Sequence, residues 1–212
     1  MLDAIERRRT IRDFAPCPIP SNTLHRLLAA GLLAPTGGGH RPWRFILVED
    51  PKVRSALADG FRRDRTPEEV AVLVDSWGVE DVDERGMYLD AIPRQASMIE
   101  GAGALIVPCF QQPEPLLAEK ASLHQLNGVV SIWLCVENIL LAAAEEGIFG
   151  VTRVPATPEE TENVRRVLGI PGDMEVPCYL ALGYPGAAAQ FGERKPADVA
   201  AAVSIDRWSF DV

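Results

Sequence analysis

The side chains best suited to bind a charged ligand stand near the start of the chain. Four arginines, Arg7, Arg8, Arg9 and Arg12, flank the hydroxyl of Thr10. An arginine is permanently charged and donates two parallel hydrogen bonds, so the cluster suits a phosphate or the carbonyl edge of a heterocycle. A solvated basic helix end has the same composition, so the cluster by itself leaves both interpretations open.

A glycine-rich segment at residues 34–45 is the second candidate, with the sequence Ala-Pro-Thr-Gly-Gly-Gly-His-Arg-Pro-Trp-Arg-Phe. Three successive glycines leave backbone N–H groups unshielded and permit the close approach of a flat ligand. The prolines and Trp43 would fix the position of this loop, whereas a flexible connector is the simpler alternative. Near the other end of the chain, Arg194 precedes Pro196 by two residues, and a surface charge is its default interpretation.

The segments around these motifs predict alternating helices and strands. Apolar residues recur at helical spacing over residues 21–32, where Ser21 is the expected N-cap, and residues 51–60 also favour a helix. Thr157 opens a capping motif for a helix that ends near Leu168. Apolar runs predict four strands, at residues 44–49, 104–110, 149–154 and 176–184.

Three further segments have a different character. Residues 61–95 are charged and weakly periodic, so we expect short helices and an excursion from the core, with a helix beginning between residues 81 and 88. A loop is expected at residues 111–115. Residues 121–146 are apolar on nearly every side, and a helix without a polar stripe must be buried all round, either centrally or against a second subunit. The chain is therefore predicted to be one α+β domain, residues 1–212, with four or five strands.

Composition and charge exclude several classes of partner. The chain has 212 residues and a formal net charge of −9, which argues against nucleic acid and anionic membranes. Residues 1–65 nevertheless carry 12 basic against 7 acidic side chains, which indicates a local anion site. The cysteines and histidines lack the spacing of metal ligands, so no metal is expected and the cysteines are predicted to be small buried hydrophobes. The charged first residues and the interrupted apolar runs predict a cytoplasmic protein without a membrane span.

Taken together, the motifs resemble the FMN-dependent nitroreductase family. Members of that family typically begin with R-R-S-x-R, continue with A-P-S-G-x-N-x-Q-P-W-x-F, and later show L-G-Y-P and a basic residue two before a proline. The matching segments here are residues 8–12 (Arg-Arg-Thr-Ile-Arg), 34–45, 182–185 (Leu-Gly-Tyr-Pro) and Arg194. The order is conserved over most of the chain, and only residues 61–100 lie outside the correspondence.

The resemblance implies a nitroreductase-like α+β fold, with a central mixed sheet and surrounding helices, in an intertwined homodimer that holds one FMN at each end of the subunit interface. Arg8 and Arg194 look like phosphate ligands, with Arg9 nearby, Thr10 as a hydrogen-bonding partner, and Arg12 as the cation beside flavin N1 and O2. The opposite subunit would supply the first half of the glycine-rich loop, and the end of a strand would cover the reactive N5 face. The residues implied for these last two roles are Pro35, Thr36 and Gly37 for the loop, and Arg153 and Val154 for the strand end. The helix at 121–146 would form the core of the dimer.

Two positions depart from the family pattern. Gly39 stands where the family usually has Asn, which removes an amide that would bond the pyrimidine edge of the flavin. Arg41 replaces the usual Gln. If Arg41 takes over that edge, its charge would stabilise the reduced flavin and raise the reduction potential; if it turns outward, it would bind an anionic substrate.

The implied activity is that of an oxidoreductase in which no side chain is catalytic. Hydride from NADH or NADPH would pass to flavin N5, and a small electron-poor acceptor such as a nitroaromatic or quinone would then be reduced in the same cleft, a ping-pong cycle. Residues 61–100 would form a substrate-covering insertion. The alternatives are a flavin-dependent dehydrogenase, a dehalogenase or a flavin-degrading oxygenase of the same fold, and a non-catalytic flavin-binding protein.

Overall fold

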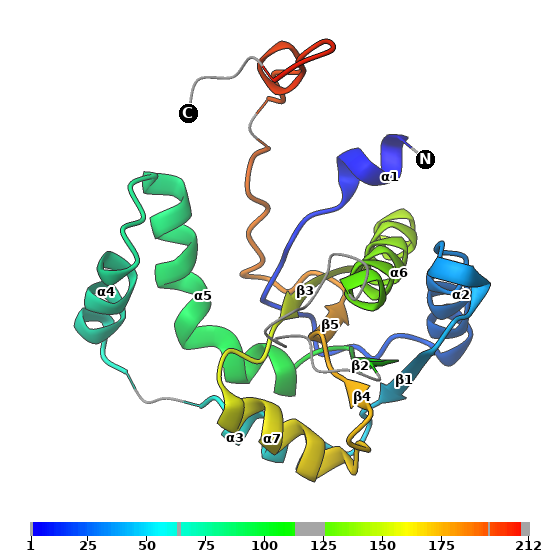
Figure 1. The fold of residues 1–212 in the computed structure, drawn as a ribbon. Helices are drawn as coiled ribbons and strands as arrows, with labels where there is room; N and C mark the ends of the chain where they lie inside the picture. The colour runs from blue at the N-terminus through cyan, green and yellow to red at the C-terminus, as the bar shows by residue number, and fades with distance from the viewer. Residues whose placement is uncertain (1, 63–64, 113–125, 195, 209–212) are drawn as a thin grey trace.

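The centre of the molecule is a five-stranded sheet with the strand order β1-β2-β5-β3, and β4 pairs with the end of β2 (Figure 1). The computed structural model describes residues 2–62, 65–112, 126–194 and 196–208. The strands are β1 (Trp43–Leu47), β2 (Ala104–Gln111), β3 (Phe149–Arg153), β4 (Met174–Glu175) and β5 (Tyr179–Gly183). These strands pair antiparallel with one another, and the mixed character predicted for the sheet rests on one isolated parallel bridge between Thr10 and Gly150.

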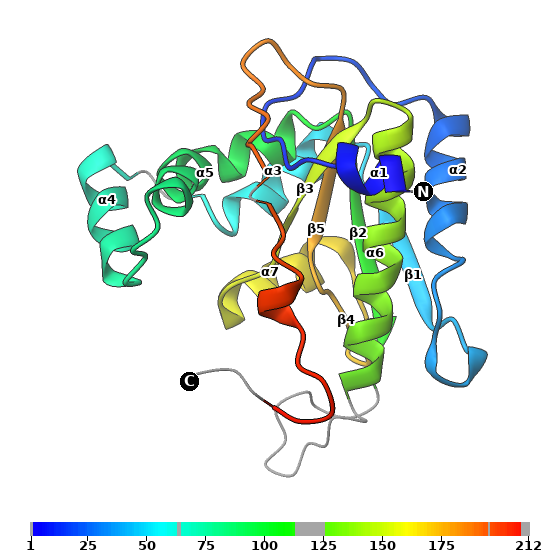
Figure 2. The ribbon, with the colours of Figure 1, turned by 90° about the horizontal axis from the view of Figure 1, so that it is seen from above.

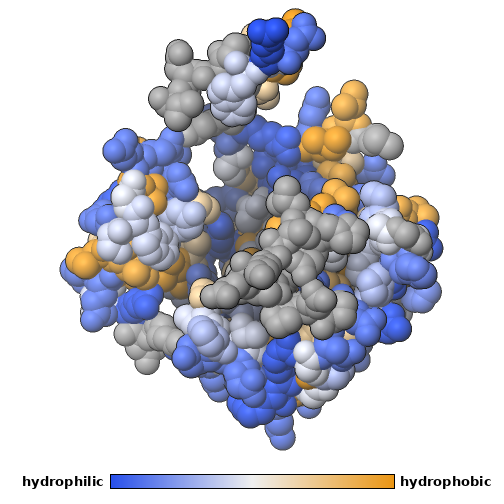
Figure 3. Space-filling view, in the orientation of Figure 1, coloured by the Kyte–Doolittle hydropathy of each residue, from blue (hydrophilic) through white to orange (hydrophobic). Residues whose placement is uncertain are grey.

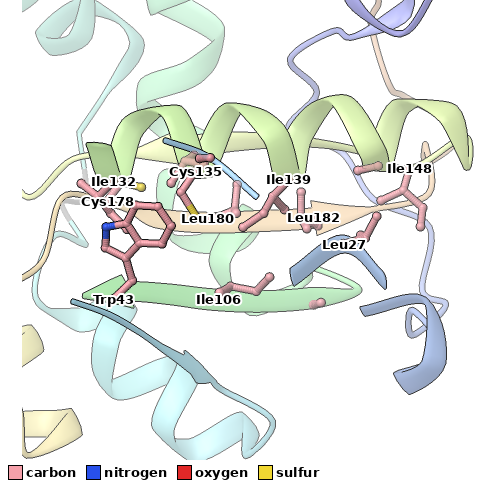
Figure 4. Close-up of a cluster of buried hydrophobic side chains, with 14 of the residues drawn as sticks. Leu27, Trp43, Ile106, Ile132, Cys135, Ile139, Ile148, Cys178, Leu180 and Leu182 are labelled. Atoms are coloured by element: carbon pink, nitrogen blue, oxygen red, sulfur yellow. The ribbon is translucent and has the colours of Figure 1, made fainter. Parts of the chain in front are cut away.

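Helices cover both faces of the sheet. They are α1 (Leu2–Arg7), α2 (Ser21–Gly31), α3 (Pro51–Asp59), α4 (Pro67–Ser76), α5 (Val82–Glu100), α6 (Asn127–Glu145) and α7 (Pro158–Leu168), with the short 3₁₀ turns η1 (Gly37–Gly39) and η3 (Ala200–Ala202). Side chains alternate between the faces, as the pleat of a strand requires. On β5, for example, Leu180 and Leu182 join the core under α2 and α6 (Figure 4), whereas Tyr179 and Ala181 join the core under α3, α5 and α7.

Most of the sequence predictions for these elements are confirmed, with bounds that differ by a few residues. The strand predicted at residues 176–184 corresponds to β5, which is shorter, and the separate short strand β4 precedes it. The predicted cap at Ser21 is wrong, because Pro20 is the N-cap and Ser21 is already the first helical residue, without a side-chain capping bond. Residues 113–115 of the expected loop and residues 121–125 of the expected long helix lie outside the described residues.

Helix α6 is the central helix, but one stripe of it is uncovered. Ile132, Cys135 and Ile139 are fully buried against the sheet and α2, while Val130 and Leu134 on the other side are 53% and 43% exposed. Burial all round is therefore not reached within a single chain, and packing of this stripe against a second subunit stays a prediction. Its 19 residues also have the length and hydropathy of a membrane span, a test that the core helix of a soluble protein passes equally well.

Helix α4 and the first half of α5 project from the rest of the molecule (Figures 1 and 2), as expected for an excursion from the core. Thr66 closes a capping box at the start of α4, and Asp81 caps α5 through the backbone N–H of Glu84. Trp77 and Tyr88 join the two helices with their ring centroids 5.3 Å apart. The second half of α5 returns to the core, because Met98 and Ile99 are buried under the sheet.

The cysteine prediction holds for three of the four positions. Cys109, Cys135 and Cys178 are buried and free, whereas Cys17 is exposed. Burial raises the pKa of the Cys178 thiol to about 12. No group of acidic, histidine and cysteine side chains that could hold a metal occurs in the part of the chain that the structure describes.

Candidate functional site

Two arginines from opposite ends of the chain meet above α6. Nη2 of Arg194 donates a hydrogen bond of 3.4 Å to the backbone carbonyl of Arg8. Nε of Arg8 lies 3.3 Å from a carboxylate oxygen of Glu137 on α6. The two arginines therefore touch through the backbone of Arg8, while the Arg8 guanidinium is turned toward Glu137. Two cations in one region of the molecule suit an anion.

The start of the chain is held against the edge of the sheet. Thr10 bridges to Gly150 of β3. A Cβ on Gly150 would stand only 2.5 Å from the carbonyl oxygen of Ala181 on β5, so the packing of β3 against β5 requires glycine here. Arg9 turns back onto its own backbone, where Nη1 donates to the carbonyl oxygens of Glu6 and Arg8. The cluster predicted at residues 8–10 is thus brought to one end of β3 and α6.

An aromatic contact holds the C-terminal arm beside the same place. After β5 the chain runs away from the sheet as an extended arm (Figure 1). Phe191 in this arm packs edge-on against Phe149 of β3, with ring centroids 5.2 Å apart. Arg194 follows three residues later, so this contact holds the stretch of backbone before Arg194 beside β3.

Arg12 faces the excursion rather than the other arginines. Its Nη2 lies 3.3 Å from the sulfur of Met87 on α5. Burial lowers the pKa of Arg12, the nearby carboxylate of Asp90 opposes this effect, and the charge of Arg94 adds to it. A thioether is a weak acceptor, so in the described part of the chain this half-buried cation lacks a strong hydrogen-bonding partner.

The glycine-rich loop lies at the opposite end of α6. A Cβ on Gly37 would stand 4.0 Å from the side-chain amide of Asn127, the first residue of α6, whereas Arg8 lies beside Glu137. Ten helical residues separate these two points, which is about 15 Å along the axis. One chain therefore keeps the two predicted halves of the site apart.

Two details of the loop fit a polar, flat ligand. The hydroxyl oxygen of Thr36 is buried and has no hydrogen-bond partner among the described residues, which is unusual because an unpaired buried hydroxyl is costly. Gly39 adopts a left-handed backbone with φ +72°. Gly and Asn are among the residues that adopt this conformation most readily, so glycine is compatible with the backbone at a position where the family usually has Asn. The side-chain amide of Asn is lost in this replacement. Pro35 and Arg41 are exposed beside it.

The strand end at Arg153 is organised differently from the sequence prediction. Arg153 is 8% exposed, and its Nη2 lies 2.9 Å from both carboxylate oxygens of Glu160. Its Nε donates to Gln95 of α5, and its guanidinium stands 3.8 Å from the ring centre of Phe61. The guanidinium is therefore committed to the protein interior, whereas the neighbouring Val154 is exposed.

Sequence reasoning missed this buried ion pair. Thr157 does cap α7, since its hydroxyl accepts from the backbone N–H of Glu160. The carboxylate of Glu160, however, accepts from the N–H of Ala156 and from Arg153 instead of closing a capping box on Thr157. A glutamate at the third helical position looks the same in the sequence in either case.

A family model describes nearly the whole of this fold. The model of the nitroreductase family matches residues 5–184. The chain belongs to the nitroreductase family. Among curated relatives, a protein named NADH dehydrogenase from Thermus thermophilus is 28% identical over 190 residues, which cover 90% of this chain and 89% of the relative.

Two solved structures of related fold carry informative ligands. Oxidized iodotyrosine deiodinase with FMN and 3-iodo-L-tyrosine has a TM-score of 0.72 at 20% identity, covering 98% of this chain and 99% of that chain. The NADPH:FMN oxidoreductase from Vibrio harveyi, in complex with NAD+, has a TM-score of 0.70 at 20% identity, covering 98% of this chain and 77% of that chain. At these identities the likeness establishes the shared fold.

Proposed function

We propose that this chain binds FMN between two copies of itself and is an NAD(P)H-dependent oxidoreductase for a small electron-poor acceptor. The observation that carries the proposal is the contact of the Arg194 side chain with the backbone carbonyl of Arg8 at 3.4 Å, which joins two arginines that are 186 residues apart in the sequence. Membership of the nitroreductase family and the flavin and nicotinamide names of its relatives support the same assignment.

The two arginines would hold the phosphate of FMN. Arg8 and Arg194 lie beside each other and would each donate N–H groups to it, while Thr10 would add a hydroxyl and Arg9 would add charge. Arg12 would face the pyrimidine edge of the flavin, where a cation stabilises the negative charge that reduction adds. These side chains bind and orient the cofactor and tune it, and none of them needs to transfer a proton.

A second copy of the chain would complete the site. Pro35, Thr36 and Gly37 lie about 15 Å along α6 from the arginines in one chain, so the partner's loop is the one expected to reach the flavin. The exposed apolar residues Val130 and Leu134 of α6 supply a surface for that association. Burial of this stripe in a homodimer would satisfy the requirement that an apolar helix face avoids water.

Substrates would enter beside the excursion. The space-filling view shows a hollow between the α4–α5 excursion and the body of the molecule, bordered by both hydrophilic and hydrophobic residues (Figure 3). FMN, when bound, supplies the two-electron chemistry by accepting hydride from NADH or NADPH and delivering the electrons to the acceptor. The excursion and Val154 would limit the access of water to the bound FMN. We also propose, from the sequence, that the protein is cytoplasmic.

The colour of the purified protein tests the proposal. We expect a yellow protein that bleaches anaerobically with NADH or NADPH and recovers its colour on addition of a quinone, a nitroaromatic or 3-iodotyrosine as acceptor. Flavin that stays oxidised with an excess of both nicotinamides would remove the reductase activity and leave flavin binding. Colourless protein that fails to bind added FMN would refute the whole proposal.

A further inference from the structure

One face of α5 is directed at Arg12. Met87, Asp90 and Arg94 follow one another at spacings of three and four residues, so they share one side of the helix. Met87 contacts the Arg12 guanidinium at 3.3 Å through its sulfur. Arg12 belongs to the N-terminal segment and α5 belongs to the excursion. This contact therefore joins a residue that is predicted to bind flavin to the α4–α5 excursion, which borders the hollow.

Asp90 is the acidic group on this face. Its carboxylate lies 2.8 Å from Nε of Arg94, and both side chains are a little over one-third exposed. The negative charge of Asp90 raises the pKa of Arg12 against the lowering effect of burial, which means that the two groups interact electrostatically. The ion pair with Arg94 ties the Asp90 carboxylate to the face of α5 that carries Met87, the residue that contacts Arg12.

A carboxylate held near Arg12 changes the field at whatever Arg12 faces. A cation at the pyrimidine edge of a flavin favours the reduced form, because reduction adds negative charge there. A carboxylate close to that cation offsets part of its positive charge, so it makes the reduced flavin less favourable. In a partly buried site this interaction is screened less than it would be in water.

We propose that Asp90 is a positioning residue that acts through Arg12, moderating the positive charge presented to bound FMN and so lowering the reduction potential of the flavin. This inference rests on the proposed function. Its consequence is that the excursion helps to set how strongly the reduced flavin drives electrons into an acceptor. A lower potential favours acceptors that are themselves difficult to reduce.

The excursion contains a matched control for Asp90. Asp75 on α4 pairs with Arg85 at 2.8 Å, the same distance as the Asp90–Arg94 pair, and both pairs lie on the surface of the excursion. Asp75→Asn therefore removes the same charge and the same kind of ion pair as Asp90→Asn. Among the described residues, only Asp90 of these two acids acts on Arg12.

The test is the midpoint potential of bound FMN, measured by anaerobic titration against a reference dye. Asp90→Asn is expected to favour reduced over oxidised FMN by about three- to tenfold, and tenfold corresponds to about 30 mV for a two-electron couple. The potential should rise in Asp90→Asn and stay unchanged in Asp90→Glu and Asp75→Asn. Arg12→Gln should shift it in the opposite direction.

Three results would overturn the inference, and they are distinguishable. If Arg12→Gln lowers the potential while Asp90→Asn leaves it unchanged, the inference fails and the proposed function stands. An equal rise in Asp90→Asn and Asp75→Asn would mean a general effect of surface charge and would also refute it. If no variant binds FMN, both the inference and the proposed function fail.

Discussion

Replacing Arg194 by alanine is the most direct probe of the phosphate site. In the structure the Arg194 side chain is exposed and donates one long hydrogen bond, 3.4 Å, to the carbonyl of Arg8. The fold should therefore lose about 0.5 kcal/mol or less, as for other surface substitutions. A hydrogen bond from a charged group to a phosphate is worth about 1.5–3 kcal/mol, so FMN should bind roughly 10- to 100-fold more weakly.

The assay compares FMN with riboflavin, which lacks the phosphate. Titration of the apoprotein by flavin fluorescence should give a weaker affinity of Arg194→Ala for FMN and an unchanged affinity for riboflavin. Arg166→Ala is the control, because Arg166 is an exposed arginine on α7 that bonds only Asn163 in the described chain. Equal FMN affinities of Arg194→Ala and the wild type, or equal losses for both flavins, would show that the phosphate does not lie beside Arg194.

Four further predictions concern stability, assembly and thiol reactivity. Glu160→Ala leaves Arg153 buried and unpaired, which should cost about 3–5 kcal/mol and lower the melting temperature by roughly 6–20 °C in circular dichroism. Leu134→Glu places a charge on the uncovered stripe of α6 and should convert a dimer to a monomer in light scattering. Cys17 should react rapidly with a thiol reagent at pH 8 and the buried cysteines slowly. Because burial raises the pKa of Cys178 to about 12, the unfolded chain loses this proton first, and stability should fall as pH rises from about 9 towards 12.

Each of these has an outcome that would contradict it. A melting temperature of Glu160→Ala equal to that of the Arg166→Ala control would mean that the ion pair contributes nothing. A Leu134→Glu protein that elutes and scatters as the wild type does would move the dimer interface elsewhere. Four equally reactive thiols in the native protein, or a stability independent of pH above 9, would contradict the burial of the cysteines.

Local patterns determined most of the elements of this protein. The apolar runs of β1, β2 and β3, the helical spacing in α2 and the capping threonine of α7 are short-range signals, because a pleat, a turn of helix and a cap each involve neighbouring residues. The positive charge of the first residues was also readable, since several arginines within one turn concentrate charge wherever the segment lies. The family resemblance added the pairing of Arg8 with Arg194, which no local rule contains.

Only the tertiary structure decided what each charged side chain contacts. Arg153 became the partner of Glu160 because β3 ends where α7 begins and α5 crosses above them. Arg12 met Met87 because the excursion returns past the N-terminal segment, and Val130 and Leu134 remained exposed because none of the described elements of one chain covers them. These contacts join residues distant in sequence, and their energy depends on burial and distance, which exist only after the chain has folded.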